Sequence, residues 1–337
     1  MRARSLAALL ASTALIAAAC APLPLGPDSR VRGPIAARNQ HPLALTVLAL
    51  PPRRAATLAR GRTGVELMSV YTSIYESGLG PGERVVFDGE VLRSSATVRQ
   101  GVGPNTDVEL QLAAVYTSSG FLDGFADAFH DTLQFADGGR SRAADDQHDM
   151  RLVRNGRTIY EVHEDEVALA DVPVIVTHRV LAEDDGTPGV ALRAGVELPT
   201  GSESAGAGNG GLDWGAGVVI EKNWPRWSIT GGVDLVIPST PDSFAGSGVD
   251  LSNVLQLQNG YEYRWTDRFS LLAQLFWTSP MIDDFSLEEI SRDVLDVGLG
   301  FAVDTSRRSK FTMSFHEDLV AATGPDFSAL LAWTWGY

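Results

Sequence analysis

Apolar and polar side chains alternate along most of this chain with a period of two. In the segment 107–116, DVELQLAAVY, every even position is apolar, whereas the odd positions begin with Asp107, Glu109 and Gln111. The same alternation recurs at 190–198, 212–221, 227–237, 269–277 and 295–301. A period of two predicts β-strands that have one apolar and one polar face.

Weaker alternation extends this pattern over the rest of the chain beyond residue 60. It covers 62–76, 83–99, 166–181, 251–265, 309–319 and the final segment 327–337. Together the segments predict about twelve strands, many of them longer than the roughly 5–6 residues usual in soluble sheets. Such lengths suit strands that cross a membrane at a tilt, which need about 9–11 residues.

The connections between these segments alternate in length. Short turns are expected at 100–106, 183–188, 222–226, 265–268 and 304–309. Longer connections are expected at about 117–165, 199–211, 238–250 and 278–292, whereas 77–82 and 320–325 are short and fit less well. Short turns at one end and long loops at the other are typical of outer-membrane barrels. The sequence therefore predicts an all-β fold over residues 61–337, a closed antiparallel transmembrane β-barrel of outer-membrane type.

The last segment carries further information about assembly. In 327–337 every odd position is apolar or aromatic, up to Tyr337 at the end of the chain. An aromatic-ended final strand resembles the signal read by the barrel-assembly machinery, and its apolar face suits outer-membrane lipid. We expect both as partners.

The N-terminus has the features of an export signal. Residues 1–20 combine Arg2 and Arg4, an apolar run and the small residues Ala17 to Ala19, followed by Cys20. This is a signal peptide, and two outcomes stay open: lipidation of Cys20, as in a lipoprotein, or ordinary cleavage near Ala19 or Ala21. Together with the predicted barrel, such a signal implies localisation to the outer membrane of a Gram-negative bacterium.

Two segments lie outside the strand pattern. Residues 21–60 are rich in Pro, Ala and Arg and are interpreted as a periplasmic N-terminal segment, with an apolar piece at 43–50 that suits a strand or a plug. The insertion at about 117–165 is expected to be extracellular and to contain a short helix, since apolar residues recur at helical spacing from Phe121 to Leu133. That helix would pack on the rim or fold over the barrel mouth, and the first interpretation is favoured.

Composition excludes several classes of protein. The net charge is -15, from 42 acidic and 27 basic residues, which argues against nucleic acid as a partner. After residue 20 no apolar run reaches the roughly 18 residues of a spanning helix, so helical membrane proteins are excluded. The histidines are too scattered for a recognisable metal site, and no cofactor is expected.

One pair of residues has a chemistry that catalysis could use. Ser314 and His316 are two residues apart on a predicted strand, so they share a face opposite Phe315 and point into the lumen. A serine beside a histidine is the minimum of a nucleophilic site. A polar pair in the lumen without catalysis is the favoured interpretation, because no established hydrolase motif accompanies the pair.

The predicted lumen face is mainly acidic. Its lining residues are expected to be Asp107, Glu109, Gln111, Arg193, Glu197, Asp213, Glu221, Asp234, Glu262, Arg264, Gln274 and Asp296. An open pore with this lining would favour cations, although side chains or a loop could also fill so narrow a barrel. The leading hypothesis is a non-enzymatic pore or channel for an unknown small solute. Two alternatives remain, a lipid-modifying barrel enzyme and a structural or adhesion barrel with a closed lumen.

Several short segments carry a family resemblance. They are RNQHPL at 38–43, FDGEVLR at 87–93, GFLDGFADAFHD at 120–131, DGGR at 137–140, ELPTGS at 197–202, LLAQL at 271–275, FHEDL at 315–319 and PDF at 325–327. As a set, in order over nearly the whole mature chain, they resemble a bacterial family catalogued as domain of unknown function 3187. The resemblance implies an outer-membrane-type barrel and brings no activity, substrate or catalytic residue with it.

Overall fold

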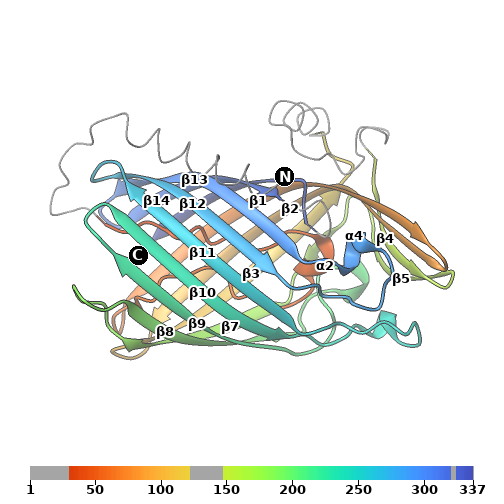
Figure 1. Cartoon of the computed structure of the whole chain (residues 1–337), viewed down its shortest axis with the longest axis horizontal. Coiled ribbons are helices and arrows are strands. Elements are labelled where there is room, and N and C mark those ends of the chain that lie inside the picture. The colour runs from red at the N-terminus through yellow and green to blue at the C-terminus, as the bar shows by residue number, and fades with distance from the viewer. Residues whose placement is uncertain (1–29, 122–146, 320–323, 337) are drawn as a thin grey trace.

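The strands of this protein form one antiparallel sheet that closes on itself. The computed structural model describes residues 30–121, 147–319 and 324–336. Within them, β1 (Thr63–Gly80) pairs with β15 (Phe327–Trp335), from Val65 opposite Trp335 to Ser73 opposite Phe327, and this pairing closes the barrel (Figure 1).

Twelve positions make up the barrel wall. In chain order they are β1, β2 (Glu83–Gly101), β3 (Thr106–Ser118), β6 with β7 (Val167–Leu169 and Val172–Leu181), β8 (Gly189–Leu198), β9 (Asp213–Asn223), β10 (Trp227–Ile237), β11 (Val254–Arg264), β12 (Phe269–Thr278), β13 (Val294–Ser306), β14 (Ser309–Asp318) and β15. β6 and β7 share one position because each pairs with a different half of β3. The predicted closed barrel of about twelve strands is confirmed.

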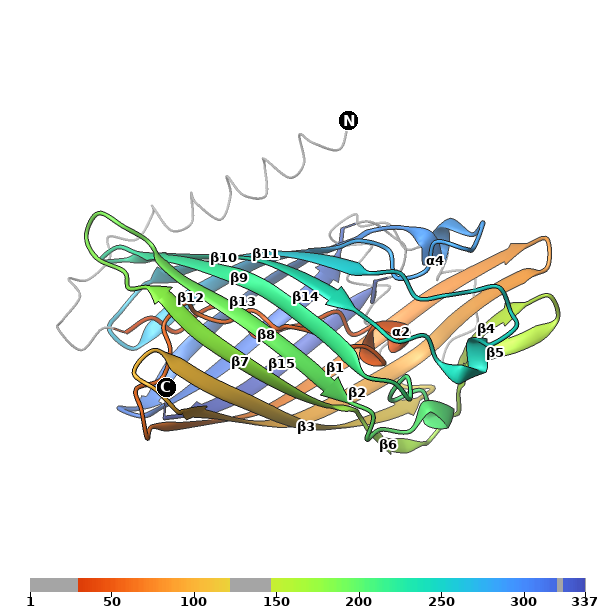
Figure 2. The same cartoon turned by 90° about the horizontal axis from the view of Figure 1, so that it is seen from below.

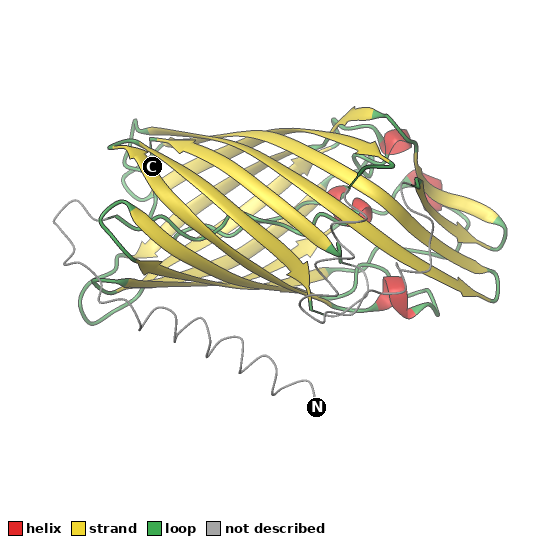
Figure 3. Cartoon of the chain, turned by 90° about the horizontal axis from the view of Figure 1, so that it is seen from above, coloured by secondary structure: helices red, strands yellow, loops and turns green. Residues whose placement is uncertain are grey.

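The two ends of the barrel differ in their connections. At one end, here called the turn end, the strands are joined by the short segments 102–105, 182–188, 224–226, 265–268 and 307–308. At the opposite end, the loop end, the connections after β8, β10 and β12 are longer and carry η2 (Glu203–Ala205), η3 (Asp242–Phe244) and α4 (Glu288–Ser291), seen as the red elements in Figure 3. Loop length therefore sorts by end as the sequence predicts, apart from the two-residue connection 81–82 between β1 and β2 at the loop end.

A hairpin that the sequence pattern did not predict extends the wall at the loop end. β4 (Asp149–Arg154) and β5 (Arg157–Val162) pair with each other, and β4 pairs with residues 83–88 of β2 (Figure 2). Both strands come from the predicted insertion at 117–165. The short helix predicted there falls on residues 122–146, outside the described residues, and stays a prediction.

The barrel is apolar outside and polar inside. On β8, Leu192 is 48% exposed and faces outward, whereas the neighbouring Arg193 is 4% exposed and faces the lumen. The same arrangement holds on β9, where the apolar Trp214 is 57% exposed and the charged Asp213 is fully buried. An apolar outer face with a polar interior suits a barrel surrounded by lipid. Among the described residues, no helix is long and apolar enough to cross a membrane.

One apolar core lies at the loop end. This cap core includes Leu43, Leu45, Ile74, Phe87, Met150, Leu152, Ile159, Phe244, Ile282, Phe285 and Ile290. Its first two members belong to α2 (Pro42–Leu45), which precedes the first barrel strand. The chain before β1 therefore reaches the loop end from inside the barrel, and this arrangement positions the site described next.

Candidate functional site

Residues 30–60, here called the plug, pass through the barrel lumen twice. The plug starts at the turn end, where Arg32 forms an ion pair with Asp304 (2.6 Å). It reaches the loop end at His41, whose Nε2 lies 2.9 Å from Glu76 Oε2, and it turns there through α2. It then returns to the turn end, where Leu58 donates its backbone N–H to Asp107. Figures 1 and 2 show this segment in red and orange between the walls of the barrel.

The plug backbone is held by carboxylates of the wall. Each of four wall carboxylates accepts one or two plug N–H groups at 2.9–3.0 Å: Glu262 from Arg32 and Gly33, Asp213 from Leu48, Glu221 from Ala55, and Asp107 from Leu58. An irregular segment inside a barrel has no strand partner for its backbone, and an unpaired buried N–H is costly. The lumen carboxylates therefore take the place of a ladder partner.

Arginines of the plug form ion pairs with the same wall. Arg53 donates from Nε and Nη2 to the two oxygens of Glu109, both at 2.9 Å, and its Nη1 lies 3.3 Å from Glu66. Arg54 donates from Nε to Glu221 at 2.9 Å. Buried charges persist when they are paired, so each side neutralises the other.

The wall also contributes a cation to the plug. Arg193 donates to the carbonyl oxygens of Pro51 (2.6 Å) and Leu50 (3.0 Å), while its Nε donates to Asp234 at 2.6 Å. The guanidinium therefore links β10, β8 and the returning part of the plug. Residues 47–59 are here called the returning limb, and they carry the ion pairs of Arg53 and Arg54 with the wall.

Glycines in the wall make room for apolar plug side chains. A Cβ atom on Gly215 would lie 3.0 Å from Leu48 Cδ2, and one on Gly195 would lie 3.0 Å from Leu50 Cδ2. Such contacts are tighter than ordinary van der Waals packing. The lumen is thus shaped around the plug by its backbone as well as by its charges.

The structure places all twelve predicted lumen residues in the interior, each at most 7% exposed. Those that contact the plug directly are Asp107, Glu109, Arg193, Asp213, Glu221 and Glu262. Others pair within the wall, as Gln111 does with Arg93, and Asp296 with His316. Acidic residues that sequence reasoning left out, Glu66, Glu76 and Asp304, join the same set.

The described part of the predicted periplasmic segment 21–60 lies inside the barrel instead. The physical reason is charge: a lumen with more carboxylates than arginines is complemented by a segment that contains Arg32, Arg53 and Arg54. The run PPRR at 51–54 is the sequence signal that could have indicated this pairing.

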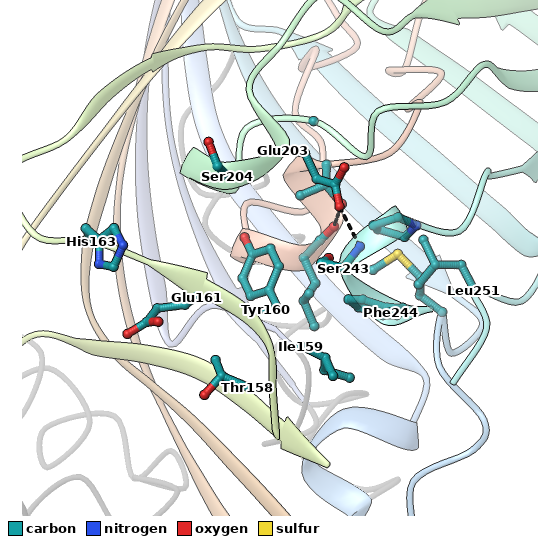
Figure 4. Close-up of a pocket in the computed structure, with 15 residues that line it drawn as sticks. Thr158, Ile159, Tyr160, Glu161, His163, Glu203, Ser204, Ser243, Phe244 and Leu251 are labelled. Atoms are coloured by element: carbon teal, nitrogen blue, oxygen red, sulfur yellow. Dashed lines mark hydrogen bonds between the residues drawn. The ribbon is translucent and has the colours of Figure 1, made fainter. Parts of the chain in front are cut away.

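A cavity of about 240 Å³ lies at the loop end, above the tip of the plug. Leu43 and Thr46 of the plug line it from below, and Tyr160, Phe244 and Met281 line its sides. Figure 4 shows Glu203 beside it, where the side chain accepts the backbone N–H of Ser243 at 2.8 Å. A second cavity between the plug and β11 to β13 measures only about 40 Å³, so the plug fills the lumen closely at that level.

The Ser314 and His316 pair predicted from the sequence lies in the lumen wall on β14. Ser314 Oγ lies 2.9 Å from His316 Nε2, and His316 Nδ1 lies 3.3 Å from Asp296 Oδ1 on β13. All three side chains are buried inside the barrel, whereas Phe315 between the first two is 43% exposed and faces outward. The sequence did not indicate Asp296 as a third member, because the register between β13 and β14 was unknown.

Solved structures with the same fold are outer-membrane channels. The crystal structure of the COG4313 outer membrane channel from Pseudomonas putida F1 is similar with a TM-score of 0.56 at 14% identity, and the match covers 86% of this chain and all of that chain. The NanC porin is similar with a TM-score of 0.49 at 8% identity, covering 81% of this chain and 100% of that one. At 14% identity, the similarity to the COG4313 channel establishes the fold alone.

A search of curated protein sequences found no match to this chain. The sequence profile of one family, described as protein of unknown function (DUF3187), matches residues 12–337. That match covers nearly the whole chain, and it agrees with the resemblance carried by the short segments from 38–43 to 325–327. The chain therefore belongs to the DUF3187 family.

Proposed function

We propose that this protein is an outer-membrane channel for small solutes, closed by its own plug in the state described. The fold is that of outer-membrane channels, and the apolar outer face suits a lipid surround. The predicted export signal at 1–20 and the aromatic positions of the final segment, up to Tyr337, support the same location and assembly by the barrel-assembly machinery. The turn end would then face the periplasm.

The observation that carries the proposal is the chemistry between plug and wall. Apolar side chains of the wall would close a lumen permanently at least as stably as ion pairs do, because replacing buried ion pairs with apolar residues is often neutral or stabilising. Here the wall instead presents Glu66, Glu109 and Glu221 to arginines of a separate segment. Ion pairs of this kind exchange for water when the segment leaves, so the closed lumen can become a hydrated one.

Release of the plug would leave an acidic conduit. The buried carboxylates of the wall, which include Asp107, Glu109, Asp213, Glu221 and Glu262, would then outnumber its buried arginines, Arg93, Arg193 and Arg264. Lumen fields of one sign concentrate counter-ions, so the open state favours small cations or solutes with a cationic group. The lipid-modifying alternative lacks a comparable observation, because Ser314 faces the lumen and not the lipid. A structural barrel with a closed lumen shares the observed plug, and recorded openings separate it from the channel.

The test is single-channel recording from the full-length protein in planar bilayers under a KCl gradient. The proposal predicts rare openings with a reversal potential that indicates cation selectivity. Changing Glu109→Gln and Glu221→Gln together should reduce that selectivity, whereas Glu288→Gln on α4, outside the lumen, should leave it unchanged. Absence of any conductance step in the wild type and in variants of the plug arginines would refute the channel.

A further inference from the structure

The lumen contains a hydrogen-bonded chain of three residues that the closing of the channel does not use. Ser314 and His316 follow each other on the inner face of β14, and Asp296 lies on the neighbouring β13. An ionised carboxylate only accepts hydrogen bonds, so Asp296 fixes the proton of His316 on Nδ1. In that tautomer Nε2 carries no proton and accepts the hydroxyl of Ser314, whose Oγ lies 2.9 Å away.

The wall is shaped to hold this arrangement. Gly300 is opposite Ser314 and Gly298 is opposite His316 in the β13–β14 register. A Cβ on Gly298 would lie 2.4 Å from His316 Cε1, and one on Gly300 would lie 2.6 Å from Ser314 Cβ. Any larger residue at either position would push the ring or the serine away. The imidazole therefore lies against bare backbone and keeps its orientation toward Asp296.

An apolar patch adjoins the serine on its other side. Leu330 of β15 is opposite Ser314, and Val70 of β1 is opposite Leu330. These two side chains cluster with Met68 on the wall and with Ile35 and Ala37 of the plug. Ser314 is 0% exposed, and Ile35 and Ala37 of the plug cover the patch beside it.

We propose that Ser314, His316 and Asp296 form a nucleophilic site that attacks small esters with an apolar acyl group once the plug has moved. Ser314 Oγ bonds to the ester carbonyl carbon while its proton passes to His316 Nε2. The bond from that carbon to the alkoxy oxygen breaks, and the alcohol leaves with the proton from His316. Water then attacks the acyl-serine, His316 takes its proton, and the carboxylic acid is released with the serine restored.

The roles follow from position. Ser314 is the nucleophile, His316 is the general base and acid, and Asp296 keeps the ring in the tautomer that leaves Nε2 free. The apolar patch of Met68, Val70 and Leu330 takes the acyl group. The proposal depends on the proposed function only in that the plug must move for a solute to reach Ser314.

The experiment uses diisopropyl fluorophosphate on the full-length folded protein; it forms an Oγ–P bond while the P–F bond breaks, and fluoride leaves with the serine proton as HF. Labelling is followed by mass spectrometry in the wild type and in the double variant Arg32→Gln, Arg53→Gln, which removes ion pairs from both parts of the plug. The matched serine control is Ser95 on β2, which is buried in the lumen wall opposite Met68 and has no histidine in its register pairs. Access is reported separately by Ser95→Cys, in a Cys20→Ser background, with a small methanethiosulfonate.

The expected result is an adduct on Ser314 in the double variant, formed at least about tenfold faster than any adduct on Ser95. His316→Gln should abolish it, and Asp296→Asn should slow it by roughly 100-fold or more, since a wrong tautomer disables the base. A merely structural role for Asp296 predicts little change in this rate, because asparagine keeps the shape of the side chain.

Three outcomes separate this proposal from the channel. If the double variant conducts and Ser95→Cys is modified while Ser314 stays unlabelled, the nucleophilic site is refuted and the channel stands. If Ser314 is labelled in a protein that never conducts, the site stands and the channel fails. If neither Ser314 nor Ser95→Cys reacts in any variant, the site is refuted, because no solute reaches it.

Discussion

Arg53 offers the most quantitative test of the plug. Its guanidinium donates two hydrogen bonds of 2.9 Å to Glu109 and lies 3.3 Å from Glu66, so Arg53→Gln leaves two lumen carboxylates without that partner. Removing one member of a buried ion pair costs about 3–5 kcal/mol. Arg99 lies 3.5 Å from Glu109 and offsets part of this loss. We therefore expect the closed state to lose about 1.5–3 kcal/mol, which is roughly a 10- to 150-fold rise in the ratio of open to closed channels.

The assay is the open probability of single channels at fixed voltage and salt. The matched control is Arg60→Gln, which removes the same charge from the same stretch of chain at an exposed position. Arg53→Gln should raise the open probability, and Arg60→Gln should leave it close to the wild-type value. Equal behaviour of the two variants would refute the reasoning that the Arg53 ion pairs hold the plug in place.

Three further outcomes follow from the packing of the plug. Gly215→Val places a branched side chain against Leu48, whose Cδ2 lies 3.0 Å from the built Cβ, and should raise the open probability, whereas Gly231→Val, with no atom nearer than 3.6 Å, should not. Leu43→Ala removes a side chain that is 3% exposed from the cap core, and a cost of about 2–5 kcal/mol should appear as more frequent opening. Gly215→Val and Leu43→Ala should both keep the heat-modifiable electrophoretic mobility of a closed barrel. Loss of that mobility shift would mean that the barrel wall needs the plug for its stability.

The barrel could be predicted from the sequence because its signal is local. Alternation at 190–198 and 212–221 matches β8 (Gly189–Leu198) and β9 (Asp213–Asn223), and period two alone decides which side chains share a face. Loop lengths then indicate closure. Each of these inferences needs only residues that are close in sequence.

For the segment before β1 the sequence indicated only that 43–50 suits a strand or a plug, and its contacts could not be predicted because its partners are far away in sequence. Arg54 meets Glu221 across 167 positions, and the plug has no periodicity that would indicate a shape. Asp296 was missed as a partner of His316 for a related reason, since the pairing register of two strands decides which residues meet across them. The fold could therefore be predicted from local patterns, whereas the site could not, because it depends on contacts between charged residues that are far apart in sequence.

The most direct test of the central claim is to fix the returning limb to the wall. A Cβ built on Gly189 lies 3.7 Å from Ala55 Cβ, within the roughly 3.5–4.5 Å that a disulfide spans between Cβ atoms. The variant combines Gly189→Cys and Ala55→Cys with Arg53→Gln, which supplies the openings, and with Cys20→Ser, which removes the one natural cysteine. Each single cysteine variant is the control.

The measurement is single-channel conductance before and after dithiothreitol, on protein whose disulfide has been shown by mass spectrometry to be complete. We predict that the oxidised channel stays closed and that reduction restores the openings, while the single cysteine variants open under both conditions. An oxidised channel that conducts as often as the reduced one would contradict the claim that residues 47–59 must leave the wall for solutes to pass.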